Sequence, residues 1–252
     1  MWAALKDLLA SVAAAAGGIA LGFVFAMTAV IFSPPAKAFN LSKDIPAQAS
    51  QFLPMLGEQA RELAPAIPAH YFGALIEHES GCPAIKRMCW QPTARLKTSR
   101  EEGAGLSQLT RAYKADGTLR FDSLHEARKL DPRGLNELRW DNVYQRPDLQ
   151  MRVMVLMTRQ NWNRVSAMTA DPTLRLQLTD LAYNAGLGRS LNDRRACGLT
   201  AGCDVHKWAG HIERTCTASR APIYGTRSAC DISRHHVADV VGTRMGKYKG
   251  RV

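Results

Sequence analysis

The first forty residues constrain the fold more than any other part of the chain. From Leu8 to Phe32 the sequence runs through 25 residues without a charged side chain. At about 1.5 Å per residue, a helix of this length crosses a hydrocarbon core of roughly 30 Å with some tilt, and it is long for a buried helix of a globular protein. We therefore expect residues 1–35 to form an N-terminal transmembrane signal anchor.

A cleaved signal peptide is the alternative for the same segment. Residues 36–38 have the A-x-A pattern of a cleavage site, although the apolar region of a signal peptide usually spans only about 7–15 residues. Gly18 and Gly22 form a G-x-x-x-G pair, which favours helix-mediated dimers in a bilayer. We expect insertion into the inner membrane through residues 8–32, and the sequence leaves open whether this anchor is retained, cleaved or released.

Composition and charge describe the rest of the chain as a basic globular protein. The sequence is 46% hydrophobic and 22% charged, which excludes wholesale disorder and a protein with many membrane spans. The formal net charge of +11 favours an anionic partner: cell wall, phospholipid or nucleic acid. Much of this excess follows Arg189, so that the basic tail either binds an anionic wall or is an ordinary solvated surface.

The six cysteines indicate an oxidising compartment. They are even in number and lie as local pairs in a chain with an export segment, which is typical of disulfides. The pairing that we expect is Cys82 with Cys89, Cys197 with Cys203, and Cys216 with Cys230.

A zinc knuckle is the alternative for part of this set. Four residues have C-x2-H-x4-H-x4-C spacing: Cys203, His206, His211 and Cys216. Such sites belong to reducing, nucleic-acid-facing proteins, whereas the N-terminal segment directs this chain outward. We therefore expect disulfides, no bound metal and no cofactor. His235 and His236 are expected to be a surface pair, because adjacent histidines normally point apart.

Apolar spacing after the N-terminal segment predicts a mainly helical protein. Residues 36–49 have the composition of a linker, and no later segment has a convincing alternating pattern of a β-strand. Asp171 and Pro172 form a favourable helix start, with an N-cap acid before a proline. Helices are expected near residues 50–66, 68–80, 122–130, 147–168 and 172–184.

An acidic side chain lies on the apolar face of the second of these helices. Glu79 follows Phe72 and Ile76 at helical spacing, so it should enter the core. Burial favours the neutral carboxyl group and raises its pKa, which suits a general acid near neutral pH. The alternative is a structural carboxyl group that a backbone amide or an arginine satisfies. Glu77 lies on another side of the helix and is expected to be a solvated surface acid.

Three motifs then occur in order along the chain. They are Glu79-Ser80-Gly81, the segment GAGLSQL at residues 103–109 and the segment AYNAG at residues 182–186. Together they resemble the soluble-type (SLT) lytic transglycosylases, whose lysozyme-like fold is shared with goose-type lysozymes and many phage lysins. The resemblance covers residues 65–190. It implies a mainly α, lysozyme-like domain behind the transmembrane helix.

The resemblance also implies a role for each matching side chain. Glu79 becomes the catalytic acid and base, followed by the small polar Ser80. Gln108 becomes a contact in the sugar groove, where its amide can donate to and accept from an N-acetyl group. Tyr183 is expected to hydrogen-bond Glu79, with a core tyrosine bonded to the backbone as the alternative. Asn184 completes the set of candidate substrate-binding residues.

The reaction of this family cuts the β-1,4 bond between N-acetylmuramic acid and N-acetylglucosamine in peptidoglycan without water. One carboxyl group protonates the glycosidic oxygen and then, as a base, helps the muramyl 6-hydroxyl to close a 1,6-anhydro ring. A lysozyme-type hydrolase instead needs a second carboxylate. Glu101 and Glu102 precede the Gly-Ala-Gly turn, near where goose-type lysozymes carry an acid, so hydrolysis is the alternative. A solvated loop pair is the other interpretation of these two residues.

The sequence therefore predicts a murein-cleaving enzyme, with residues 50–190 as the catalytic domain and residues 191–252 as its basic, cysteine-containing C-terminal extension. We expect it in the inner membrane with the domain facing the periplasm, acting on glycan strands in phage lysis or wall penetration. Export after signal cleavage and packaging in a phage virion are the alternative locations. A wall-binding or virion structural protein without activity is the rival function, and nucleic-acid binding is the least supported.

Overall fold

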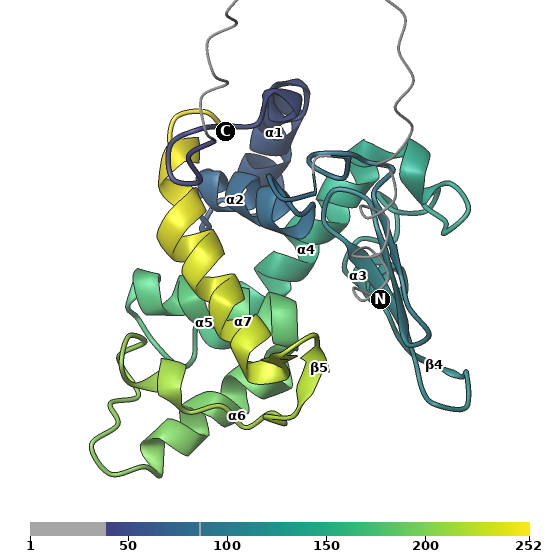
Figure 1. Ribbon diagram of the computed structural model, residues 1–252. Helices are drawn as coiled ribbons and strands as arrows, with labels where there is room; N and C mark the ends of the chain where they lie inside the picture. Colours follow the sequence, from purple (N-terminus) through teal and green to yellow (C-terminus); the bar gives the residue numbers. More distant parts are fainter. Residues whose placement is uncertain (1–38, 86) are drawn as a thin grey trace, which may run out of the picture. The chain divides into compact units, whose positions relative to one another are not determined.

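The computed structural model describes residues 39–85 and 87–252, and about half of these residues are helical (Figure 1). Five helices coincide with the segments for which apolar spacing predicts them, to within a few residues. They are α1 (Leu53–Leu63), α2 (Ala69–Glu79), α3 (Ser123–Leu130), α4 (Pro147–Val165) and α5 (Pro172–Ala185). These predictions are confirmed. The chain then adds α6 (Leu187–Gly198) and α7 (Ala229–Val237).

Short helical turns connect and extend these helices. The 3₁₀ turn η1 (Ala47–Gln51) precedes α1, whereas η2 (Val143–Gln145) and η3 (Ile212–Arg214) lie between helices. After α7 the chain continues through a π-helical turn, η4 (Ala238–Arg244), and a 3₁₀ turn, η5 (Met245–Tyr248). Figure 1 shows α7 and these turns as one yellow rod beside α5 and α2. The rod therefore brings the C-terminal segment back to a helix near the start of the described chain.

Between α2 and α3 the chain forms an antiparallel sheet that the sequence pattern does not predict. Its strands are β1 (Arg95–Lys97), β2 (Glu101–Ala104), β3 (Leu109–Tyr113) and β4 (Leu119–Asp122), in the order β1-β2-β3-β4. A small hairpin joins β5 (Pro222–Tyr224) to β6 (Arg227–Ser228). The apolar pattern does not indicate β1 to β4 because these strands are short. They also contain glycine and paired charges, such as Glu102 opposite Arg111, in place of an apolar alternation. The expected mainly α, lysozyme-like fold is therefore wrong.

The predicted membrane anchor also requires correction. In the part of the chain that the structure describes, no helix combines the length and the apolar character needed to cross a bilayer. Residues 8–32, on which the prediction rests, lie outside the described residues, as do residues 36–38 and the pair Gly18 and Gly22. The absence of such a helix from the described residues contradicts the expectation of a single-pass inner-membrane protein with a periplasm-facing catalytic domain.

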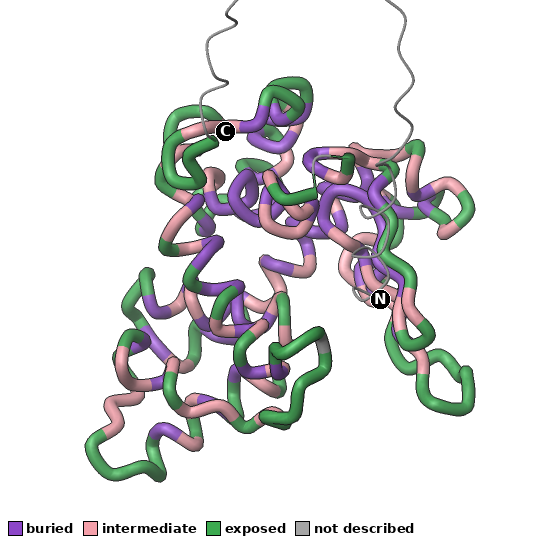
Figure 2. Tube along the Cα trace, in the orientation of Figure 1, coloured by how far each residue is buried: buried purple, intermediate pink, exposed green. Residues whose placement is uncertain are grey.

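Helix α2 is buried on nearly all sides. Its residues Tyr71 to Glu77 are all buried, because α1 covers one face and η4 and η5 cover another. The close approach of η5 requires a glycine: a Cβ on Gly73 would lie 2.7 Å from Cδ1 of Tyr248. In Figure 2, buried segments run through this part of the molecule, and α2 is therefore one of its central elements.

The contact between α2 and the C-terminal rod contains a buried cluster of charges. Glu77 is fully buried, and its Oε1 accepts hydrogen bonds from Arg244 at 2.6 Å and from Lys247 at 2.7 Å. Its Oε2 accepts a hydrogen bond from the hydroxyl of Tyr248. Arg244 also donates to the carbonyl of Cys82 at 2.8 Å. The prediction of a solvated Glu77 is therefore wrong, because an amphipathic pattern assumes only one buried face whereas α2 has two.

All three expected disulfides are present: Cys82–Cys89, Cys197–Cys203 and Cys216–Cys230. The zinc-knuckle alternative fails because Cys203 and Cys216 are each bonded to a different cysteine. His211, a third member of the supposed knuckle, accepts a hydrogen bond from the backbone amide of Asp204 at 3.0 Å. The disulfides fasten the loops around α2, α6 and the start of α7.

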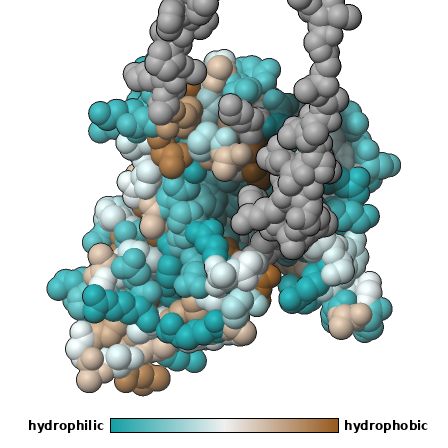
Figure 3. Space-filling model, in the orientation of Figure 1, coloured by the Kyte–Doolittle hydropathy of each residue, from teal (hydrophilic) through white to brown (hydrophobic). Residues whose placement is uncertain are grey.

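The core of the described chain extends across both its first and its second half. One cluster of apolar side chains lies around α1, α2 and α4, and a second surrounds α5 and α6 with Trp208 and Val237. Residues Phe39–Val252 form one compact unit, so that the C-terminal extension packs with the preceding domain. On the described surface visible in Figure 3, hydrophilic residues predominate and hydrophobic ones lie in small groups.

Candidate active site

Glu79 is the last residue of α2. Its side chain is 17% exposed, so it is less deeply buried than the apolar spacing predicts. Oε1 lies 2.9 Å from Nε2 of His236, which comes from α7. Among the residues that the structure describes, Oε2 of Glu79 has no hydrogen-bond partner. One oxygen of the carboxyl group is thus held while the other is free.

His236 is itself held from behind by a second carboxylate. Its side chain is only 1% exposed, and Nδ1 lies 2.7 Å from Oδ2 of Asp180 on α5. Asp180 is fully buried, and its Oδ1 accepts a hydrogen bond from the hydroxyl of Tyr71 at 2.9 Å. The prediction of a surface histidine pair is therefore wrong for His236 and holds only for His235, which is exposed.

Electrostatics determine which of these groups carry protons. Burial by itself would lower the pKa of His236, but the carboxylates of Asp180 and Glu79 raise it to about 10. The imidazole is therefore cationic at neutral pH and donates one N–H to Oδ2 of Asp180 and the other to Oε1 of Glu79. Burial, followed by the charge of Asp180, raises the pKa of Tyr71 well above its ordinary value, so Tyr71 remains a phenol and donates to Asp180.

Helix α5 positions the third motif against the second and against His236. The helix begins at Asp171, whose side chain accepts the backbone amides of Thr173 and Leu174, as the N-cap prediction requires. Further along, the hydroxyl of Tyr183 donates to the carbonyl of Ser107 at 2.9 Å, and its ring stacks on His236 with centroids 6.4 Å apart. The expected hydrogen bond from Tyr183 to Glu79 is therefore replaced by one to the backbone.

Glu79 still influences Tyr183 through its charge. Burial comes first and the negative charge of Glu79 second among the causes that raise the pKa of Tyr183 well above its ordinary value. Tyr183 is consequently a neutral phenol that links the second motif, through Ser107, to the ring of His236.

The Gly-Ala-Gly turn is fastened to α4 by a buried amide. Gln150 accepts the backbone amide of Leu106 at 2.8 Å, and a Cβ on Gly105, where φ is +73°, would overlap its side chain. Gln108 has a φ of +46° and donates from Nε2 to the carbonyl of Gly105 at 2.9 Å. Its Oε1 lies over Gly103, where a Cβ would approach to 2.6 Å. The amide expected to contact sugar is thus partly engaged in shaping the turn.

Two other expected substrate contacts differ in exposure. Ser80 is fully buried, donates to the carbonyl of Ile76 at 2.7 Å and accepts the backbone amide of Trp90 at 3.0 Å. Its hydroxyl therefore stabilises the chain after α2 and is not available to a ligand. Asn184, near the end of α5, is exposed to solvent.

The two glutamates proposed as a second carboxylate lie in β2, not in a solvated loop. Glu102 is buried and forms ion pairs with Arg95 at 2.6 Å and with Arg111 at 2.8 Å. The hydrogen bond from Arg111, which outweighs burial, together with Arg95 lowers the pKa of Glu102. Glu101 is partly exposed and, as its neighbour in the strand, points to the opposite face of the sheet. Glu102 is therefore a structural residue that forms ion pairs with two arginines.

His78 of α2 supports His236 from another side and is itself bonded to the π-helical turn. The ring of His78 contacts the ring of His236 in an edge arrangement, with centroids 4.4 Å apart. His78 Nδ1 lies 2.6 Å from Oδ2 of Asp239, which also accepts from Arg244 at 2.6 Å. Burial alone would raise the pKa of Asp239, but His78 and Arg244 lower it to about 2. Irregular π turns of this kind occur often at functional sites.

The sequence contains a signal for Asp180 that the three motifs do not include. Leu176, Asp180 and Tyr183 are spaced i, i+4, i+7, so the aspartate shares the inward face of α5 with a tyrosine that was itself expected to point inward. His236 is followed by Val237 and Val240, which mark the buried face of the C-terminal rod. Neither pattern reveals that these two faces meet.

Both ring nitrogens of His236 are engaged by carboxylates. Across the described residues, no group of three or more histidine, cysteine or acidic side chains is arranged to hold a metal ion.

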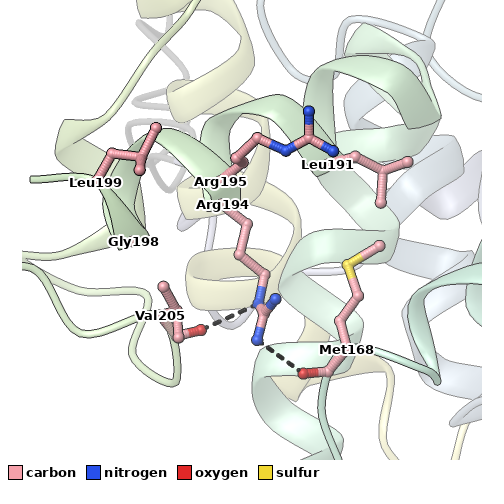
Figure 4. A pocket seen from close by; sticks show the side chains of 7 residues that line it. All are labelled: Met168, Leu191, Arg194, Arg195, Gly198, Leu199 and Val205. Carbon is pink, nitrogen blue, oxygen red and sulfur yellow. Dashed lines mark hydrogen bonds between the residues drawn. The ribbon is translucent and has the colours of Figure 1, made fainter.

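A separate open hollow of about 470 Å³ lies beside α6 (Figure 4). Leu191, Gly198 and Leu199 contribute to its lining, and the guanidinium of Arg194 donates to the carbonyls of Val205 and Met168. The guanidinium of Arg194 thus joins α6 to the two segments that carry these carbonyls, and Arg195 also lines the hollow.

Neither a protein-family model nor a curated protein nor a solved structure matches the chain, so the arrangement around Glu79 is the basis on which its function is inferred.

Proposed function

We propose that the protein is a peptidoglycan lytic transglycosylase in which Glu79 is the general acid and base. The observation that carries the proposal is the meeting of three distant segments that bear the family motifs. Glu79 bonds to His236, the ring of His236 stacks on Tyr183, and Tyr183 bonds to the backbone at Ser107. A chance occurrence of three short motifs gives no reason for them to be linked through one histidine that bonds to Glu79.

The free oxygen of Glu79 suits the two proton transfers of this reaction. In the first, protonated Glu79 gives its proton to the glycosidic oxygen as the bond from C1 of N-acetylmuramic acid to that oxygen breaks. In the second, the muramyl 6-hydroxyl forms a bond to C1 and gives its proton to the Glu79 carboxylate. The 1,6-anhydro ring closes, Glu79 is again protonated, and no water is consumed.

The surroundings of Glu102 favour this route over hydrolysis. An inverting glycosidase needs a second carboxylate about 6.5–9.5 Å from the acid, and a retaining one needs it at about 5–5.5 Å. Glu102 is bound by two arginines, which makes it a weak base. Hydrolysis would therefore have to use Glu101, and the products distinguish the two outcomes.

The character of the whole chain is consistent with the proposed substrate. Three disulfides are typical of an oxidising compartment, where peptidoglycan lies. The net charge of +11 attracts an anionic polymer. We propose glycan strands as the partner, and phage lysis or wall penetration as the setting.

The test is digestion of purified murein sacculi by the full-length protein with its disulfides intact, followed by mass analysis of the released muropeptides. We expect 1,6-anhydro ends from the wild type and at least about a hundredfold lower release from Glu79→Gln, since general acid–base catalysis typically contributes 10²–10⁴-fold. Glu58→Gln, the same change at an exposed residue of α1, is the matched control. Reducing ends would identify a hydrolase, and full activity of Glu79→Gln would refute the role of Glu79.

A further inference from the structure

Four side chains hold the imidazole ring of His236 in place. Its two nitrogens bond to Glu79 and Asp180, its face stacks on Tyr183, and its edge meets His78. These partners come from α2 and α5, so two helices hold the orientation of a ring that α7 carries. The resulting position directs Nε2 at one oxygen of Glu79 and leaves the other oxygen free.

Resting on the function proposed above, we propose that His236 and Asp180 are a pair of positioning residues for Glu79. His236 holds Oε1 so that Oε2 faces the glycan, and its positive charge stabilises the carboxylate that exists between the two proton transfers. Asp180 keeps the imidazole oriented and cationic. None of the three motifs of the resemblance contains either residue.

The position of Glu79 at the end of α2 explains why a positive charge on His236 matters. The last turn of a helix presents unpaired carbonyl groups and a partial negative charge, which disfavours an anion there. A carboxylate that forms at the end of α2 therefore needs a nearby cation. His236 is that cation, and a hydrogen bond between ionised partners is roughly twice as strong as a neutral one.

Asp180 is suited to keep His236 protonated. It is fully buried, so its charge is weakly screened, and Tyr71 occupies its second oxygen with a hydrogen bond. The trio of Glu79, His236 and Asp180 carries a net charge of about −1 when all three are ionised. Removal of the charge at Asp180 leaves the buried imidazolium with one carboxylate, and burial then favours its neutral form.

The other titratable groups around the ring have partners of their own. His78 on α2 is bonded to Asp239, and Tyr71 and Tyr183 remain neutral phenols. On α7, His235 is exposed, with its ring centroid 5.9 Å from that of His78. From β6, the charge of Arg227 acts on His235, whose pKa is lowered first by burial and second by this arginine. Glu79 and Asp180 are therefore the groups that determine the protonation of His236.

The experiment compares Asp180→Asn and His236→Gln with the wild type, using anhydro-muropeptide release from sacculi between about pH 5 and pH 10.5. Asparagine keeps an acceptor for Nδ1–H without the charge, and glutamine keeps a donor towards Glu79 without the cation. His235→Gln, the same change at the exposed neighbour, is the matched control. Thermal unfolding of each variant at neutral pH shows whether it is folded.

For the wild type and His235→Gln we expect a rate that falls on the alkaline side as His236 loses its proton. Asp180→Asn should move this alkaline limb at least about one pH unit lower, while His236→Gln should abolish the limb and lower the neutral rate at least about tenfold. A purely structural role would lower the amount of active protein without moving the limb. A folded Asp180→Asn variant with the wild-type rate and the wild-type limb overturns the proposal.

A second measurement is independent of activity. Nitrogen chemical shifts of the His236 ring, followed by NMR from about pH 6 to pH 10.5, report its protonation directly. We expect the ring to remain protonated above about pH 8 in the wild type and to titrate at lower pH in Asp180→Asn and in Glu79→Gln. A wild-type ring that titrates near pH 6.5 overturns the proposal. Absence of glycan cleavage together with the expected titration would instead refute the proposed function alone.

Discussion

Nε2 of His236 lies 2.9 Å from Oε1 of Glu79, although 157 residues separate the two along the chain. The contact joins the end of α2 to α7, and it depends on the return of the C-terminal rod to the first part of the fold. Several physical consequences of this arrangement can be measured without knowledge of the substrate.

The stability of the protein should depend on the protonation of His236. Its pKa is raised from an ordinary value of 6.5 to about 10, so the folded state binds this proton more tightly than the unfolded state. The resulting stabilisation is complete below about pH 6.5 and is lost as the pH rises through about 10. We expect the difference in free energy of unfolding between the wild type and His236→Gln to be largest near pH 6 and to shrink towards pH 10.5. Urea unfolding at a series of pH values measures it, and a difference that grows with pH would contradict the assigned charge.

Loss of Arg244 should destabilise the contact between α2 and the C-terminal rod. The substitution Arg244→Met leaves Glu77 and Asp239 with fewer cationic partners in a buried environment. Removal of one member of a buried ion pair typically costs about 3–5 kcal/mol, and we expect a decrease of that size in the free energy of unfolding. Arg100→Met, at an exposed arginine, should change it by no more than about 0.5 kcal/mol. Denaturant titration compares the two, and equal effects would show that the cluster contributes little.

A residue larger than glycine at position 73 should lower the free energy of unfolding. The added methyl group in Gly73→Ala would lie 2.7 Å from Cδ1 of Tyr248, and overpacking of this kind typically costs about 1–3 kcal/mol. The control is Gly188→Ala in α6, where a Cβ meets no atom within 4 Å. There the better helix propensity of alanine should increase stability by about 0.5–1 kcal/mol. The two substitutions are thus expected to move the midpoint of thermal unfolding in opposite directions, and a shift of the same sign would contradict the close contact.

Opening the Cys216–Cys230 disulfide should destabilise the segment that leads into α7. This bond spans a sequence separation of 14, compared with 6 for Cys197–Cys203. Since loop-closure entropy grows with loop length, a loop of this size corresponds to about 3 kcal/mol. We expect the double change Cys216→Ser with Cys230→Ser to lower the free energy of unfolding by about that amount, and by more than the matching change at the shorter loop. Thiol titration of the unfolded, unreduced wild type should detect no free thiol in the described part of the chain.

Local pattern was sufficient for several elements of this protein. The helices α1 to α5, the N-cap at Asp171 and the three disulfides follow from apolar spacing, capping chemistry and the placement of cysteines in nearby pairs. The sheet could not be predicted in this way. Its strands are stabilised by cross-strand pairs such as Glu102 with Arg111, which are recognisable only when the partner strand is known.

The sequence alone determined that Glu79 stands at the end of a helix and that Tyr183 shares one face of another with Asp180, because helical periodicity relates residues a few positions apart. Only the tertiary structure decided that Glu77 is the buried carboxylate of α2 and that His236 pairs with Glu79. Both outcomes depend on where the C-terminal rod packs. The rod packs where it buries apolar surface against several helices at once, and no local sequence pattern predicts that position.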